Sequence, residues 1–141
     1  MEAVVKHLKG KAYVIESALS TTERGFDIVA ISPVSSRKLL VEAKGGTSSK
    51  PGTARYGLPF DAKQARSHVA VAFLWAAMVR ENPEFKDAEI ALAFPEDANH
   101  QKLIENLTEA LKALGILVFF VDGTRRVTLK VGCLDSTESF P

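Results

Sequence analysis

This chain of 141 residues has few of the features that define several large classes of protein. It has a single cysteine, Cys133, so it carries neither an internal disulfide framework nor a cysteine metal cluster. No apolar run reaches the roughly 18 residues that a membrane-spanning helix needs. The first ten residues alternate charged and apolar side chains and lack the apolar core of a signal peptide. We therefore expect a soluble, cytoplasmic protein.

The composition is that of an ordinary globular domain. Hydrophobic residues make up 46% of the chain and charged residues 25%. A chain of this length is typical of one domain, since domains usually hold roughly 100–200 residues. We expect residues 1–134 to form a single domain and residues 135–141, DSTESFP, to be a flexible tail.

The formal net charge is only +1, but charge is unevenly distributed along the chain. Residues 37–66 hold seven cationic side chains and two carboxylates, a net charge of +5. Residues 81–109 hold two cationic side chains and eight carboxylates, a net charge of −6. This split suggests that the basic segment meets an anion and that the acidic segment faces water. Two solvated faces that merely differ in charge are the alternative.

Hydrophobic periodicity predicts an α/β protein. Apolar residues recur at helical spacing over 3–19, although Gly10 weakens that helix. Further helices are predicted at 62–80, capped by Asp61, and at 98–114, ending before Gly115. The predicted strands are 26–32, 38–44, 88–94, 116–122 and 127–131, the last an edge strand. A hairpin followed by alternating helices and strands predicts a three-layer α/β/α fold with a central mixed β-sheet.

The first two predicted strands bring charged side chains together. If the turn lies near residues 34–35, paired residue numbers sum to about 69–71, which places Asp27 opposite Glu42 or Lys44. Side chains alternate along a strand, so Glu42 and Lys44 share one face of the sheet with Asp27. Two adjacent carboxylates repel each other, and a divalent cation such as Mg²⁺ or Mn²⁺ relieves the repulsion. A neighbouring ammonium can orient a water molecule and offset phosphate charge, so these residues suit phosphodiester hydrolysis.

Asp27 followed by Glu42-Ala43-Lys44 resembles the motif of the PD-(D/E)xK nuclease superfamily, which has a restriction-endonuclease-like fold. The resemblance covers roughly residues 3–95, and Phe26 stands where the motif has proline. It implies a metal-dependent nuclease that acts on DNA more readily than on RNA. It also implies Asp27, Glu42 and the Ala43 carbonyl as metal ligands, with Lys44 serving the attacking water.

The resemblance extends to residues outside the hairpin. Glu16, on the predicted first helix, is similar to the helix-borne glutamate of Holliday-junction resolvases and some restriction enzymes, which implies a third catalytic acid. A solvated helix charge is the alternative for Glu16. Gln64 and His68, one turn apart, are similar to the glutamine-bearing helix of several exonuclease branches. The residues expected to contact nucleic acid are Lys50, Arg55, Lys63, Gln64, Arg66 and His68.

Residues 45–60, rich in glycine, proline, serine and threonine, are predicted to form a loop that closes over nucleic acid. A disordered linker is the alternative. Helix 62–80 is apolar on nearly every side, so we expect a homodimer that buries Val71, Trp75 and Met78. His7 and His100 are predicted to lie on the surface. Two other functions stay open: a toxin-type ribonuclease of the same fold, and an inactive nucleic-acid-binding or assembly subunit.

Overall fold

The structure, a computed structural model, describes residues 1–19, 25–45 and 61–134. In these ranges the chain forms a six-stranded mixed sheet and three α-helices, so the fold class is α/β as predicted. The helices are α1 (Glu2–Gly10), α2 (Ala62–Glu81) and α3 (Ala98–Ala113), with a 3-10 turn η1 (Pro83–Phe85). The strands are β1 (Val14–Ala18), β2 (Ile28–Ile31), β3 (Lys38–Ala43), β4 (Glu89–Pro95), β5 (Ile116–Val121) and β6 (Val127–Val131). Most of the predicted loop, with Lys50 and Arg55, and the predicted tail 135–141 lie outside the described residues.

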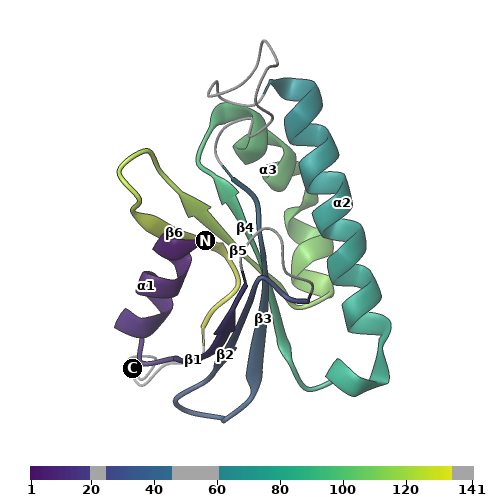
Figure 1. Cartoon of the computed structure of the whole chain (residues 1–141). Helices are drawn as coiled ribbons and strands as arrows, with labels where there is room; N and C mark the ends of the chain where they lie inside the picture. The colour runs from purple at the N-terminus through teal and green to yellow at the C-terminus, as the bar shows by residue number, and fades with distance from the viewer. Residues whose placement is uncertain (20–24, 46–60, 135–141) are drawn as a thin grey trace.

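The strands lie in the sheet in the order in which they follow one another along the chain. β3, β4 and β5 are parallel, whereas β1, β2 and β6 pair antiparallel with their neighbours. The crossovers through α2 and α3 step across the sheet in the same direction. Because such crossovers are right-handed, both helices lie on one face. α1 covers the opposite face, which gives three layers (Figure 1).

Each face of the sheet has its own hydrophobic core. On the α2–α3 face, Ile90, Leu92 and Phe94 of β4 are fully buried. On the other face, Ala91 and Ala93 belong to the core that includes Val4 and Leu8 of α1. Burial on both faces explains why β4 is an unbroken apolar run rather than an alternating one.

The predicted helix over 3–19 is wrong in its second half. α1 ends at Gly10, and Ala12 adopts a positive φ of 67°, which no helix continues through. Val14 and Ile15 are β-branched and favour extended backbone, and Val14–Ala18 pairs antiparallel with β2 as strand β1. A strand therefore precedes the Asp27 strand in the chain, and Glu16 lies on β1 rather than on a helix.

The other predicted elements are confirmed to within two residues. β6 coincides with the prediction and lies at one edge of the sheet. Asp61 caps α2 as expected: its Oδ1 accepts a hydrogen bond from the Gln64 N–H at 2.8 Å. The Gln64 Oε1 in turn accepts one from the Asp61 N–H at 3.0 Å. Within the described ranges, none of the helices has the length and apolarity needed to span a bilayer.

Candidate active site

The β2–β3 hairpin has the register predicted from its sequence. Ile28 pairs with Val41 and Val29 with Leu40, which places Asp27 opposite Glu42. The Asp27 Oδ2 accepts a hydrogen bond from the Ala43 N–H at 2.8 Å, so the Asp27 carboxylate lies against the backbone at the end of β3. The last residues of β3 thus lie beside the residue that precedes β2.

The Glu42 carboxyl group lies in surroundings that disfavour its ionised form. Its side chain is 19% exposed, and the Lys44 Nζ lies 3.6 Å from its Oε1. The pKa of Glu42 is raised to about 7: burial is the largest cause, the charge of Asp27 and a hydrogen bond with Asp27 act in the same direction, and Lys44 acts against them. Near neutral pH the Glu42 carboxyl group is therefore partly protonated.

The chemistry of this donor set fits a small divalent cation. Mg²⁺ takes one or two carboxylates in addition to waters and phosphate oxygens, and does not need an all-protein cage. Among the residues with described positions, no group of three or more His, Cys, Asp or Glu side chains is arranged to hold a metal. Two adjacent carboxyl groups, of which Glu42 has a raised pKa, suit a magnesium-type site, with the Ala43 backbone next to Glu42 in the chain.

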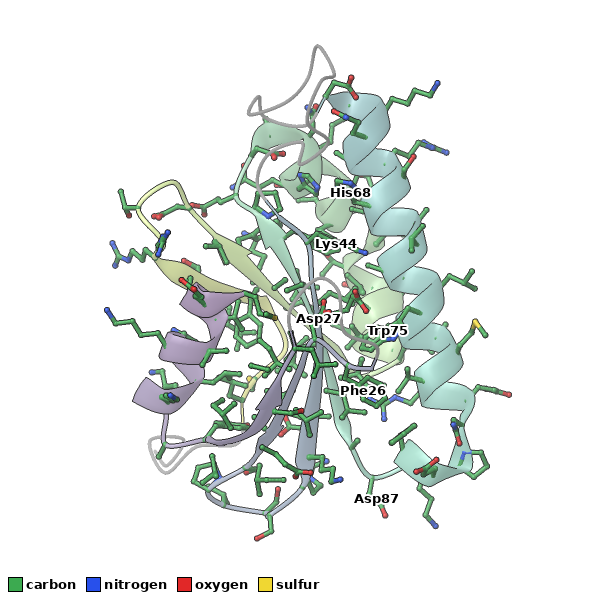
Figure 2. The ribbon with its side chains drawn as sticks, viewed as in Figure 1. Phe26, Asp27, Lys44, His68, Trp75 and Asp87 are labelled. Carbon is green, nitrogen blue, oxygen red and sulfur yellow. The ribbon has the colours of Figure 1, made fainter. Side chains whose placement is uncertain are left out.

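The position of the pair in the sheet favours ligand binding. Glu42 and Lys44 lie at the carboxyl end of β3, next to the carboxyl end of the parallel strand β4. Ligands in open α/β sheets bind outside the carboxyl ends of the strands. β2 pairs antiparallel and β4 parallel with β3, so the pair lies where the antiparallel part of the sheet meets the parallel part. Figure 2 shows Asp27 and Lys44 at this edge, with His68 of α2 beside Lys44.

The prediction that His100 lies on the surface is wrong, because its side chain is fully buried. Its Nδ1 lies 2.8 Å from each carboxylate oxygen of Asp97, and its backbone N–H donates to Asp97 Oδ1, also at 2.8 Å. The ring stacks between Phe94 and His68, with centroid distances of 5.6 and 6.0 Å. An aspartate three residues before a histidine, just after an apolar strand, is the local signal that could have found it.

His68 belongs to the same group of side chains. Burial lowers the pKa of His68, the neighbouring His100 and Lys44 lower it further, and Asp97 opposes them. His68 is therefore a neutral imidazole near pH 7, with one nitrogen that donates and one that accepts. Asp97 comes from the acidic segment 81–109, so that segment does not face away from the site as a whole, although Asp87 does (Figure 2).

Other predicted site residues lie elsewhere. Glu16 pairs with Lys38 at 3.7 Å, both side chains being about half exposed. Lys38 begins β3 and Glu42 is near its end, so Glu16 is not brought to the Asp27–Glu42 pair. Lys63 and Arg66 are exposed on the first turns of α2, and the Gln64 side-chain oxygen is engaged in the helix cap.

Trp75 packs inward, contrary to its predicted place in a dimer interface. Its ring meets the Phe26 ring edge to face, with centroids 5.9 Å apart (Figure 2). The Phe26 ring also meets the Phe85 ring edge to face, with centroids 5.2 Å apart. Phe26, at the position of the motif's proline, thus anchors the chain just before Asp27 against α2 and η1. Val71 and Met78 are exposed, as an interface would require.

Comparison of the chain with protein-family models, curated proteins and solved structures finds no match. The class that the fold defines is therefore a mixed α/β domain with a carboxylate pair at the edge of its parallel strands. Any activity must be argued from that pair, from Lys44 and from the two histidines beside them.

Proposed function

We propose that this chain is a metal-dependent nuclease with a restriction-endonuclease-like fold, which hydrolyses phosphodiester bonds, in DNA rather than RNA. The observation that carries the proposal is the grouping of Asp27, Glu42 and Lys44 at one edge of the sheet. The order of these residues, an acid followed by Glu-x-Lys in the second strand of a hairpin, resembles the PD-(D/E)xK motif. The helix–strand–hairpin–helix order around them is in keeping with that fold.

The chain's own groups have distinct roles. The Asp27 and Glu42 carboxylates and the Ala43 carbonyl would hold the ion, and Glu42 must first lose the proton that its raised pKa retains. Mg²⁺ or Mn²⁺, when bound, supplies Lewis-acid chemistry at a phosphoryl oxygen and at the leaving oxygen. Lys44 orients the attacking water and offsets negative charge that develops on the phosphate.

The test is cleavage by the purified chain of duplex DNA, single-stranded DNA and RNA, with Mg²⁺, Mn²⁺, Ca²⁺ or a chelator. Asp27→Ala, Glu42→Ala and Lys44→Ala each remove one of the groups that would act in the reaction, and each should lower the rate by about a hundredfold or more. That loss corresponds to about 3 kcal/mol of barrier, since about 1.4 kcal/mol is a factor of ten. Lys38→Ala is the matched control: it changes an exposed lysine at the other end of the same strand.

The result decides among the alternatives. Cleavage of RNA alone would favour the toxin-type ribonuclease, and metal-independent nucleic-acid binding without cleavage would favour an inactive subunit. Wild-type cleavage rates in the Lys44→Ala protein would refute the assignment of roles.

A further inference from the structure

We propose that His68 and Lys44 form a subsite for the non-bridging oxygens of a phosphate group, and that Asp97 and His100 are positioning residues that hold His68 in it. This inference rests on the proposed function and deepens it. It adds two residues, Asp97 and His100, that the sequence motif does not include.

The orientation of His100 is strongly constrained. Asp97 is the N-cap of α3 and uses the same carboxylate to cap the helix and to contact the imidazole. An ionised carboxylate only accepts hydrogen bonds, so the His100 Nδ1 donates. The ring is also nearly parallel to Phe94 of β4, at an interplanar angle of 27°. His100 is thus held by hydrogen bonding in its plane and by packing on its face.

His68 takes its position from His100. The two rings lie at an interplanar angle of 24°, although they come from different helices, α2 and α3. The Lys44 charge acts on His68, and Figure 2 shows His68 over the end of β3 where Lys44 lies. Contacts run from the start of α3 through Asp97 and His100 to His68, and His68 lies beside Lys44 of the candidate site (Figure 2).

The charges of this group suit a phosphate. Lys44 supplies a full positive charge, and a neutral His68 donates one N–H without adding a second cation beside it. The Asp97 carboxylate is hydrogen-bonded by His100 and by the helix end, and these bonds hold the carboxylate and His100 in place. Such an arrangement recognises phosphate oxygens by geometry as well as by charge.

The decisive experiment compares kcat and KM for cleavage of one labelled DNA duplex by four variants. His68→Ala should lower kcat/KM by about tenfold to a hundredfold, the effect of one hydrogen bond to a charged group. His100→Phe keeps the stacking on Phe94 and His68 but removes the bond to Asp97, and should cost about tenfold. Asp97→Asn keeps a helix cap and should lie between these variants and wild type. His7→Phe, the same change at a histidine that packs on Phe119 on the opposite face of the sheet, should have no effect.

Spectroscopy distinguishes a positioning role of His100 from a purely structural one. Side-chain ¹⁵N shifts of the Ca²⁺-loaded wild-type chain should show His100 protonated at Nδ1, and inorganic phosphate should shift the His68 ring nitrogens and the Lys44 ammonium. In fully folded His100→Phe protein the His68 response should weaken. Phosphate that shifts neither group, or wild-type kcat/KM in both His100→Phe and Asp97→Asn, would overturn the inference. An absence of cleavage by wild type would instead refute the nuclease proposal and leave the phosphate titration as the test of the subsite.

A different observation carries a second inference: the exposed face of α2 binds a second copy of this chain. Val71, Leu74 and Met78 lie on one stripe of α2 and are 59%, 60% and 65% exposed. Beside Leu74 the stripe adjoins an apolar groove of about 530 Å³ between α2 and α3, lined by Val69, Phe73 and Leu103 among others.

Charge complementarity selects the partner and its direction. The first turns of α2 carry exposed Lys63 and Arg66, and the end of α2 with η1 carries exposed Glu81 and Glu84. An antiparallel pair of α2 helices about a two-fold axis near Leu74 sets Val71 against Met78 and each basic end against an acidic end. Three side chains are less than a standard interface of about 800 Å² per partner, so we infer a weak, reversible dimer.

Sedimentation over a range of concentrations tests this inference. Leu74→Asp should abolish a dimer seen in wild type, whereas Val34→Asp, at another exposed apolar residue, in the β2–β3 turn, should not. Reversing the charges at one end of α2 should weaken the dimer, and reversing both ends should restore it. A wild-type monomer at every concentration, or a dimer that Leu74→Asp leaves intact, would refute it.

Discussion

Replacement of Glu42 by glutamine should stabilise the metal-free protein, by an amount that depends on pH. The folded-state pKa of Glu42 is about 7, whereas an unperturbed glutamate has a pKa of 4.5. A raised folded-state pKa means that the native state binds the proton more tightly than the unfolded state. The stability associated with that proton is complete below the unfolded pKa and is lost as pH rises through the folded one.

The size of the effect follows from the gap between the two pKa values. Each pH unit of that gap corresponds to about 1.4 kcal/mol, so the native state loses about 3 kcal/mol between acid pH and about pH 8. Glutamine is neutral at every pH and does not lose this stability. Glu42→Gln should therefore be more stable than wild type by about 3 kcal/mol near pH 8 and by less than about 1 kcal/mol near pH 5.

Thermal unfolding in a chelating buffer measures this difference. For a chain of this length 1 kcal/mol is roughly 3–4 °C, so the Tm should rise by roughly 10 °C near pH 8. Glu105→Gln, at an exposed glutamate on α3, is the control for loss of a surface charge. With excess Mg²⁺ the order should reverse, because only wild type gains stability from binding the ion. A Glu42→Gln protein that is less stable than wild type in chelator, or equally stabilised at both pH values, would refute the strained carboxyl pair.

Three further outcomes follow from the structure. Binding of Mn²⁺ should release nearly one proton from Glu42 near pH 6 and almost none near pH 8.5. Calorimetry in buffers of different ionisation enthalpy measures the number of protons released, and equal release at both pH values would contradict the raised pKa. Lys63→Gln with Arg66→Gln should make the log–log salt dependence of duplex binding in Ca²⁺ shallower by nearly two, and an unchanged slope would mean that these exposed side chains do not contact phosphates. Phe26→Ala should lower the free energy of unfolding by about 3 kcal/mol in urea denaturation, because it removes the ring packed on Trp75 and Phe85; a loss within error would show that the aromatic cluster carries little stability.

The hairpin was predictable because two independent constraints agree on its register. The turn position limits the pairs of residues that can face each other, and the apolar residues of 28–31 and 39–41 must cover the sheet. A slip of one residue would turn buried side chains such as Ile28 and Val41 to the opposite face. The Asp27–Glu42 pair follows from that register alone, which is why it could be identified before the fold was known.

The errors have a different physical origin. Apolar residues over 3–19 fit helical spacing as well as they fit a short helix followed by a strand, and the backbone at Ala12 and the β-branched Val14 and Ile15 separate the two. The spacing of Asp97 and His100 is a local signal of their hydrogen bond, but the contacts of His100 with Phe94 of β4 and His68 of α2 join separate elements and have no local pattern. Glu16 was assigned to the site by its position on a helix that does not extend that far.

The strain between Asp27 and Glu42 persists because the backbone around it is fixed. The Ala43 N–H donates to Asp27, and the Lys44 N–H donates to the Ala93 carbonyl of β4 at 2.9 Å. Moving the Asp27 carboxylate away would break the first of these bonds, at the junction of the antiparallel and parallel pairings. Uptake of a proton or a cation relieves the pair without the loss of that bond. A proton relieves it at low pH, and under the proposed function a divalent ion would relieve it at higher pH.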